Sequence, residues 1–451
     1  MLRIAVAVLV AAGVLVPVPA AGGELPRLPR STVSHRVETP SPRVGQRVVV
    51  TGRVRPAARR PVLLQRLVGK RWVRVATDRT DRRGRYRLSV MPSAAGPLRL
   101  RVRVPAARGR RATGSPVIRV RVRVGAVACR RGPGPVDPAA DAAAVALVRT
   151  LDDWRCAGRT ALGQQVNISN DAWADLLDVA PARFRVVGFD LTELADALAL
   201  GKAERLDRLV DLARAGHVLT ASWHARNPWT GGDWNDRSGA DLGALLTRRS
   251  GGDAAAYDAF WATWDQHLGT LAQLGAAGVP VVVRPLHEAG GGWFWWGHPD
   301  PAEYRALFTR LQQRAAARGV HNLLWAYAAA PRTWSGVHDP VALVPARVDL
   351  GGTDSYDDTA DGRPAVLDLS SYAAVAARVP RMALTEVGPQ HSDGSWDPRV
   401  VTDTLRRTRT PALWAMFWFD DAQGRKAVRS LHGGRTWLAS RPGGLCPGVV
   451  G

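Results

Sequence analysis

The sequence predicts an α/β protein, a (β/α)8 barrel preceded by a small all-β sandwich. Residues 30–126 alternate apolar and polar side chains with period two, which is typical of half-buried antiparallel strands. From residue 141 onward, eight short apolar runs alternate with helical stretches, as in parallel strands buried on both faces. The charge changes at the same boundary: residues 21–128 hold 27 Lys and Arg against four acidic residues, whereas residues 129–451 hold 34 basic and 35 acidic residues.

The overall composition describes a folded chain. Of the 451 residues, 46% are hydrophobic and 22% are charged, which excludes global disorder and a polytopic membrane protein. The N-terminus carries Arg3, an apolar run over 4–18 and small residues over 20–23, the pattern of a secretory signal peptide over residues 1–21. We therefore expect a secreted, extracellular protein that can associate with the cell wall. A retained membrane anchor is the alternative, although the apolar run is short for a membrane span.

The β-sandwich is predicted over residues 30–126. Six alternating runs predict its strands: 47–50, 62–65, 72–75, 86–90, 98–104 and 117–124. The stretch from "TGRVRP" to "GRYRLSV" resembles the immunoglobulin-like modules of exported bacterial proteins. Arg99, Arg101 and Arg103 line one face of a strand. Two interpretations stay open for this basic module: a solvated surface, or contact with an anionic cell-wall polymer or acidic polysaccharide. Nucleic acid is not expected, because no known reading element is present.

A linker is predicted over residues 127–140, because residues 125–138 contain three prolines and three glycines. Export would allow a disulfide among the three cysteines, Cys129, Cys156 and Cys446. One bridge and one free thiol are expected, and the sequence leaves the pairing open. A bridge to Cys446 would fasten the C-terminus to the start of the large domain.

The barrel domain is predicted over residues 141–446. Its eight apolar runs are 162–168, 184–189, 218–223, 279–286, 322–327, 348–354, 382–387 and 413–419. The clearest helical stretches between them are 203–214, 254–274, 301–318, 372–378 and 399–406. A doubly wound open sheet is the alternative, but it calls for a glycine-rich phosphate turn after the first strand. Ser169, Asn170 and Asp171 occupy that position instead.

Functional groups of such a barrel project from the C-terminal ends of its strands. The large domain has only five glutamates, and two of them, Glu288 and Glu386, lie at the ends of strands four and seven. Paired carboxylates beside aromatic side chains suit glycoside hydrolysis, in which one carboxyl serves as acid and base and the other as nucleophile. The chain also has 17 Trp against seven Phe and six Tyr. We interpret this excess as a sugar-binding surface.

Other kinds of chemistry lack their motifs. His287 and Glu288 would begin a zinc-binding helix only if a histidine stood at position 291, which is Gly291. The acidic stretch over 354–358 lacks EF-hand spacing, and no Gly-x-Ser-x-Gly elbow occurs. Cys156 precedes the first predicted strand and has no histidine near it in the sequence that would act as its base, which argues against a cysteine nucleophile. We expect no metal and no cofactor, because carboxylates and water are enough for glycoside hydrolysis.

The segment "VVVRPLHEAGGGWFWWG" (281–297) resembles the acid/base motif of glycoside hydrolase family 26, a family of retaining (β/α)8 glycosidases. "LTASWHARNP", "DLGGTDSY" and "ALTEVG" are similar to other strand ends of that family, in the same order. The resemblance implies that Glu288 is the general acid/base and Glu386 the nucleophile. The substrate-binding residues that it implies are His224, His287, Trp293, Asp354, Tyr356 and Trp418. The sequence departs from the family at Ala289 and Gly290, which would alter the leaving-group side, and the three glycines would make this loop unusually free.

Most members of this family are endo-β-1,4-mannanases, so the resemblance implies a secreted retaining mannanase that acts on mannan, galactomannan or glucomannan. Two alternatives remain. The first is a retaining glycanase that acts on β-1,3-xylan or mixed-linkage β-glucan, and the second is an exported polysaccharide-binding protein without catalysis. The polysaccharide is the expected partner, and the chain is expected to be a monomer.

Overall fold

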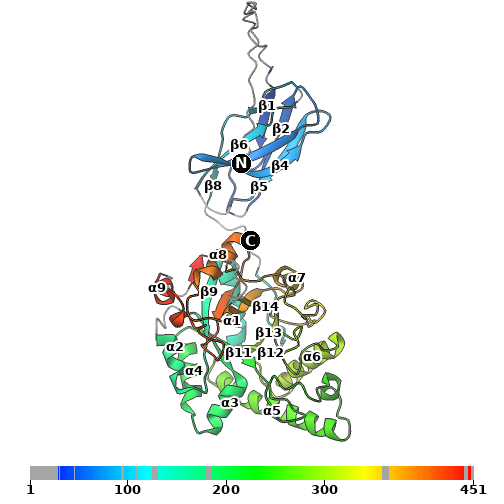
Figure 1. The fold of residues 1–451 in the computed structure, drawn as a ribbon, viewed down its shortest axis with the longest axis vertical. Coiled ribbons are helices and arrows are strands. Elements are labelled where there is room, and N and C mark those ends of the chain that lie inside the picture. The colour runs from blue at the N-terminus through cyan, green and yellow to red at the C-terminus, as the bar shows by residue number, and fades with distance from the viewer. Residues whose placement is uncertain are drawn as a thin grey trace, which may run out of the picture. The chain divides into compact units, whose positions relative to one another are not determined.

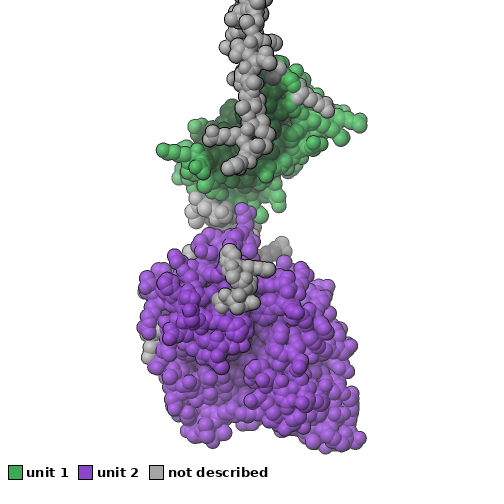
Figure 2. Space-filling model, in the orientation of Figure 1, with its two compact units in different colours: residues 1–125 green, residues 126–451 purple. Residues whose placement is uncertain are grey.

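The computed structural model describes residues 29, 31–44, 46–92, 96–107, 109–123, 131–178, 184–357 and 365–440, together with the backbone of 445–447. The chain divides into two compact units, residues 1–125 and 126–451 (Figure 2). The predicted signal peptide (1–21) and Cys129 lie outside the described residues. No described helix is long and apolar enough to cross a membrane.

The first unit is built from two antiparallel sheets around one apolar core (Figure 1). One sheet has the order β1-β2-β5, and the other contains β4-β3-β6-β7 with β8 paired to β6. Strands β6 and β8 alternate buried Leu, Val and Ile with arginine, as the period of two predicts. The strands are β1 (Thr32–Val37), β2 (Val48–Arg55), β3 (Pro61–Val68), β4 (Arg71–Arg79), β5 (Arg85–Val90), β6 (Gly96–Val104), β7 (Thr113–Gly114) and β8 (Ile118–Val122). The predicted small β module is confirmed, and its immunoglobulin-like character stays a prediction.

The second unit is a closed barrel of eight parallel strands with helices around it (Figure 1). Each strand pairs with the next, and the last pairs with the first, which closes the barrel. All eight apolar runs form the predicted strands. These are β9 (Arg159–Gln165), β10 (Val186–Asp190), β11 (Val218–Trp223), β12 (Val281–Pro285), β13 (Leu323–Ala329), β14 (Leu350–Asp357), β15 (Met382–Pro389) and β16 (Trp414–Phe417). The fold-class prediction is therefore confirmed, and the open-sheet alternative is excluded.

The five predicted helices are present with small shifts at their ends. They are α4 (Glu204–Arg214), α5 (Gly252–Ala276), α6 (Pro301–Ala317), α7 (Tyr372–Ala376) and α8 (Arg399–Thr408). The helices that were not predicted are α1 (Ala142–Cys156), α2 (Asp175–Asp178), α3 (Leu191–Ala199) and α9 (Gly434–Ala439). A short strand, β17 (Leu445–Pro447), pairs antiparallel with β9 beside the closed barrel.

Helix α1 closes the N-terminal end of the barrel. Its apolar residues, among them Leu147 and Leu151, pack against the first residues of the barrel strands, such as Val186 and Val218. Asp152 of the same helix is buried and forms an ion pair with the equally buried Arg381. Because this end is filled and covered, the C-terminal ends of the strands are left for the site.

The segment before α1 packs against the barrel unit. The backbone N–H of Val136 donates to Asp349, 2.8 Å away, and Asp137 contacts His321 at 2.8 Å. Residues 131–140, which we expected to form part of a linker, therefore belong to the second unit. Cys156 at the end of α1 is in a disulfide. The side chains of the two other cysteines lie outside the described residues, so the pairing stays open.

Candidate active site

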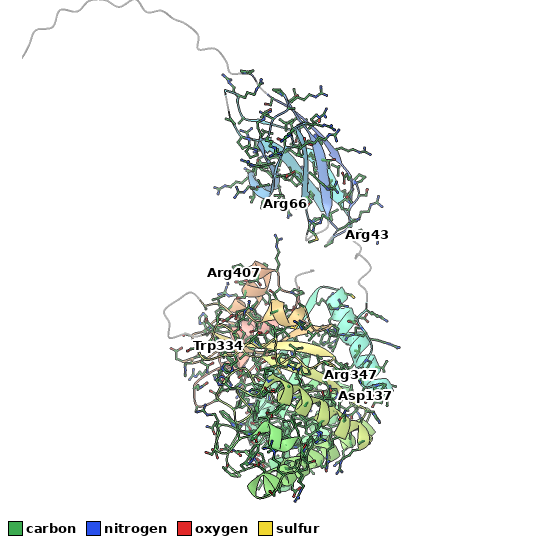
Figure 3. The ribbon with its side chains drawn as sticks, turned by 90° about the vertical axis from the view of Figure 1, so that its right-hand side faces the viewer. Arg43, Arg66, Asp137, Trp334, Arg347 and Arg407 are labelled. Carbon is green, nitrogen blue, oxygen red and sulfur yellow. The ribbon has the colours of Figure 1, made fainter. Side chains whose placement is uncertain are left out.

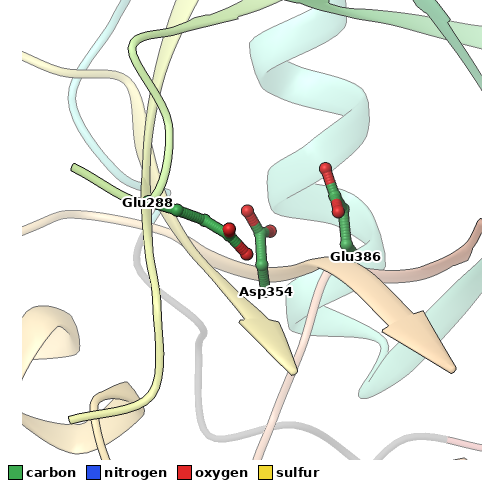
Figure 4. Close-up of side chains that lie close together, drawn as sticks. All are labelled: Glu288, Asp354 and Glu386. Atoms are coloured by element: carbon green, nitrogen blue, oxygen red, sulfur yellow. The ribbon is translucent and has the colours of Figure 1, made fainter. Parts of the chain in front are cut away.

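Three carboxyl groups meet at the C-terminal end of the barrel (Figure 4). Glu288 follows β12, Asp354 lies in β14 and Glu386 lies in β15. One carboxylate oxygen from each residue lies within 4.8 Å of the other two. The sequence predicted that Glu288 and Glu386 would face one pocket, and the structure brings them together. All three side chains are buried, with exposed fractions of 7%, 0% and 5% for Glu288, Asp354 and Glu386.

The positive charge at this cluster comes from Arg284 of β12. Its guanidinium donates to Asp354 Oδ2 at 3.0 Å and also to Glu386 Oε1. Arg284 is fully buried, and a buried guanidinium needs such carboxylate partners because burial without them is costly. Burial alone would lower the pKa of Arg284, but the charges of Glu386 and Asp354 raise it, so the group stays cationic. Arg284 thus supplies one positive charge that the Asp354 and Glu386 carboxyl groups share.

The two glutamates have different partners. The Tyr356 hydroxyl donates to Glu386 Oε2 at 2.7 Å, so this carboxylate accepts from Tyr356 on one oxygen and from Arg284 on the other. Glu288 receives a hydrogen bond from the indole Nε1 of Trp293 at 2.7 Å, and no described cation pairs with it. Two carboxyl groups with environments this different are suited to opposite protonation states.

The pKa values follow this difference. Burial, followed by the nearby charges of Asp354 and Glu386, raises the pKa of Glu288 well above its usual range. Burial also raises the pKa of Asp354 to about 8, although Arg284 opposes the shift. Figure 4 shows the carboxyl groups of Glu288 and Asp354 close together, which explains why the charge of Asp354 disfavours the charged form of Glu288. The surroundings of Glu288 therefore favour its protonated form.

These raised pKa values predict how stability depends on pH. The native state keeps protons that the unfolded chain releases above pH 4 to 5, so the free energy of unfolding should fall as pH rises from about 5 to 8. In Glu288→Gln the amide stands in for the protonated acid and does not titrate. We expect a smaller loss of melting temperature over this range than in wild type. The control is Glu204→Gln, since the Glu204 side chain is 63% exposed. Equal slopes for wild type and Glu288→Gln would contradict the raised pKa.

Two histidines lie beside the carboxyl cluster. His287 is buried, its Nε2 is 4.0 Å from Glu386 Oε1, and its ring is 4.7 Å from the ring of His224. Burial, together with the charge of Arg284, lowers the pKa of His287 well below its usual range, so this ring is neutral. The ring of His224 also lies 5.9 Å from Trp418, the half-buried residue after β16. The structure thus gathers all eight residues that the resemblance implied.

Asp190 orients His224, and the sequence reasoning missed it. It ends β10, and its Oδ2 lies 2.9 Å from Ser222 Oγ, from the backbone N–H of His224 and from His224 Nδ1. Its Oδ1 accepts from the backbone N–H of Thr192 at the start of α3. In the sequence Asp190 resembles an ordinary helix cap. Its position one residue after a predicted barrel strand, where functional groups project, could have identified it as a candidate site residue.

Trp234 is a second residue that the sequence reasoning missed. It is 39% exposed, and its ring lies 5.8 Å from His224 and 5.3 Å from Phe294. An exposed indole beside the carboxyl cluster is suited to stacking on a sugar. Trp334, labelled in Figure 3, is half-buried, and its ring lies 6.0 Å from that of Trp293.

The glycines after Glu288 have a different role from the expected one. A Cβ on Gly291 would come within 2.2 Å of the Trp293 ring, and a Cβ on Gly292 within 2.7 Å of His298. The loop is also fixed by backbone hydrogen bonds, such as the one from His298 N–H to the Ala289 carbonyl. The expectation of an unusually free loop was therefore wrong, because these glycines make room for the rings packed against them.

The interpretation of the tryptophan excess was also largely wrong. Eleven of the 17 tryptophans are buried, so most of them fill the protein core. Within the run 293–296, only Trp293 is half-buried, whereas Phe294, Trp295 and Trp296 are at most 5% exposed. The six tryptophans that retain exposure are Trp72, Trp229, Trp234, Trp293, Trp334 and Trp418. Composition alone could not separate these two groups.

Comparison with known families identifies the same region of the chain. The model of a family described as glycosyl hydrolase family 26 matches residues 159–433. A mannan endo-1,4-beta-mannosidase of Thermothelomyces thermophilus is 31% identical over 233 residues, 48% of this chain and 46% of that protein. A protein of the same name from Bacillus subtilis (strain 168) is 30% identical over 174 residues, 36% of this chain and 46% of its own length. The chain thus spans about half the length of these relatives.

Solved structures share the fold of the second unit. The structure of Bacillus subtilis mannanase man26 superposes with a TM-score of 0.55 and 20% identity, covering 69% of this chain and 94% of that one. A Cellulomonas fimi endo-beta-1,4-mannanase double mutant superposes with a TM-score of 0.52 and 25% identity, covering 68% and 75%.

Proposed function

Because the chain belongs to glycosyl hydrolase family 26, we propose that it is an endo-β-1,4-mannanase that cleaves mannan, galactomannan or glucomannan. The observation that carries the proposal is the pair Glu288 and Glu386. These carboxyl groups approach each other across the C-terminal end of the barrel. Glu288 has no cationic partner among the described residues, whereas Glu386 is bound to Arg284 and Tyr356. The names of the relatives at 30% and 31% identity support mannan as the substrate.

The proposed mechanism is a double displacement. Protonated Glu288 gives its proton to the glycosidic oxygen while a Glu386 oxygen bonds to C1, and the bond from C1 to the glycosidic oxygen breaks. The leaving sugar departs with the proton. Glu288, now a carboxylate, then takes a proton from water as the water oxygen bonds to C1 and the bond to Glu386 breaks. Each step inverts C1, so the overall configuration is retained.

The spacing of the carboxyl groups favours this mechanism over single displacement. Retaining glycosidases place their carboxyl groups about 5–5.5 Å apart, whereas inverting enzymes leave roughly 6.5–9.5 Å for a water molecule. One oxygen of Glu288 lies within 4.8 Å of one oxygen of Glu386, which leaves no such room.

The substrate would lie between the aromatic side chains at this end of the barrel. We assign the floor beneath the sugar being cleaved to Trp418, with contacts from His224 and His287. Trp293 lies beside the acid, and next to it is a hollow of about 410 Å³ lined in part by Asn235, Arg237 and His298. The hollow supports binding of the leaving-group side there.

Reducing-sugar release from a panel of soluble polymers tests this proposal. The panel contains galactomannan, glucomannan, β-1,3-xylan and barley β-glucan. We expect release from the two mannans, with the new reducing ends appearing first as the β-anomer in a time course of proton NMR spectra. Release of reducing sugar from xylan or β-glucan alone would show that mannan is not the substrate. First appearance of the α-anomer would show that the enzyme inverts the anomeric configuration. If no reducing sugar were released from any of the four polymers but one of them retarded the protein in affinity electrophoresis, the result would favour a non-catalytic polysaccharide-binding protein.

We also propose that the chain is secreted. The support is the sequence pattern of residues 1–21, a basic tip, a short apolar run and a small-residue cleavage zone. Mass spectrometry of the protein recovered from the culture medium should find an N-terminus near residue 21. Recovery of the full-length chain in the membrane fraction would instead support a retained anchor.

A further inference from the structure

One face of the first unit carries a regular array of arginines. Strand β6 buries Leu98, Leu100, Val102 and Val104, so Arg99, Arg101 and Arg103 lie on the opposite face. Strand β8 buries Ile118, Val120 and Val122, which places Arg119 and Arg121 on that same outer face. We name Arg99, Arg101, Arg103, Arg119 and Arg121 the arginine face. Figure 3 shows the long side chains that project from the strands of this unit.

The register brings these cations close together. Arg99 lies directly opposite Arg119 on the neighbouring strand, where like charges destabilise a sheet. Arg101 extends over the ring of Trp72, with its guanidinium 4.4 Å from the ring centre, and its Nε donates to Gln65 at 2.8 Å. Burial and the charge of Arg103 lower the pKa of Arg101. The array therefore costs stability when nothing neutralises it.

No described acid neutralises the arginine face. The acids described in this unit are Glu38, Asp78 and Asp81. Glu38 pairs with Arg87 of the other sheet. Asp78 and Asp81 accept hydrogen bonds from the backbone N–H groups of Arg87 and Arg85. Within the described residues, none of the five arginines takes part in an ion pair.

General arginine enrichment of the protein does not explain this imbalance. The barrel part of the same chain is also rich in arginine, but its 34 basic residues are balanced by 35 acidic ones. The surplus of positive charge is confined to the small unit. A difference between two parts of one chain points to a property of that unit's surface.

We propose that the arginine face binds an anionic polysaccharide, a chain of sugars or sugar alcohols with repeated carboxylate or phosphate groups. Alternate residues of a strand are roughly 6.6–6.8 Å apart and neighbouring strands about 4.8 Å apart, so the face presents cations in two dimensions to an extended polymer. Each guanidinium presents a planar fork that matches carboxylate or phosphate.

The choice of a glycan over other polyanions rests on the proposed function of the barrel, which acts on polysaccharides. The arginine face is one side of a five-stranded sheet. The major groove of DNA more commonly receives a helix or a separate two-stranded ribbon, and the described strands of this face form neither. Binding through this face would hold the barrel near a polymer that the barrel itself does not cleave.

Affinity electrophoresis of the full chain tests the proposal. The gels contain polygalacturonate as the carboxylate polymer, a wall teichoic acid as the phosphate polymer, or neutral dextran. We expect retardation by at least one anionic polymer and none by dextran, and weakening by about 0.3 M NaCl. The variant Arg99→Thr/Arg119→Thr/Arg121→Thr should bind about tenfold more weakly, because three exposed charge-assisted contacts are lost. Threonine is chosen because it suits strands.

The matched control removes the same charge from exposed positions outside the arginine face, Arg36→Thr/Arg59→Thr/Arg82→Thr. We expect it to bind nearly as tightly as wild type. An equal loss in both variants would show an effect of net charge alone and overturn the proposal, as would absence of retardation by both anionic polymers. If duplex DNA abolished the retardation at a lower concentration than either free anionic polymer, the arginine face would be a nucleic-acid-binding surface, and the proposal would be overturned. Mannan cleavage is measured separately, so failure of the proposed function and failure of this binding are distinguishable.

Discussion

Replacing Glu386 with alanine should reduce turnover of galactomannan by at least about 10⁴-fold, because the carboxylate that bonds to C1 is lost. The fold should survive. Glu386 is one of three neighbouring buried carboxyl groups, of which only Glu386 and Asp354 pair with Arg284, so its removal relieves repulsion with Glu288 and Asp354. The melting temperature at pH 8 should equal or exceed that of wild type. Reducing-sugar assays and thermal unfolding measure the two effects.

Azide gives this prediction a sharper test. In Glu386→Ala the small anion can enter the vacated space and attack C1 directly, which yields the α-glycosyl azide from a β-linked substrate. In Glu288→Ala the covalent intermediate still forms from an aryl glycoside with a good leaving group, and azide then yields the β-product. The control Glu204→Ala should keep full activity. Full activity of Glu386→Ala, or the same anomer from both variants, would contradict the assigned roles.

Replacing Arg284 with methionine should destabilise the barrel by about 3–5 kcal/mol, because Asp354 and Glu386 lose their shared buried cation. The loss should be larger at pH 8 than at pH 5. Without Arg284 the two carboxyl groups are expected to take up protons, and that costs more as pH rises. Activity should fall as well, since the Glu386 carboxylate would lose the hydrogen bond from Arg284 that orients it. Chemical denaturation at the two pH values measures the effect.

A surface pair supplies the comparison for this prediction. Arg248 contacts Asp258 with side chains that are 57% and 53% exposed, so Arg248→Met should cost less than about 1 kcal/mol at either pH. If Arg284→Met destabilised the protein no more than Arg248→Met, the buried cluster would not depend on its arginine.

The amino-acid pattern alone was enough to predict the strands of the barrel and the pair of glutamates. Parallel strands covered on both faces must be continuously apolar, so each left a short run such as 218–223, between helical stretches with period 3.6. Chemistry at such a barrel occurs at one end of the strands, which directed attention to Glu288 and Glu386 among only five glutamates. The position of Arg99, Arg101 and Arg103 on one face of a strand could also be predicted, because alternate residues of a strand point to the same side.

Features that depend on contacts between distant segments could be identified only in the folded chain. Helix α1 closes the barrel through partners far along the chain, such as Asp152 with Arg381. Asp190 resembles a helix cap until the register of β10 and β11 brings it to His224. Tryptophan can fill a core or line a site, and only packing distinguishes buried Trp296 from half-buried Trp293. The protonation of Glu288 likewise depends on Asp354 and Glu386, because charges act through space and not along the chain.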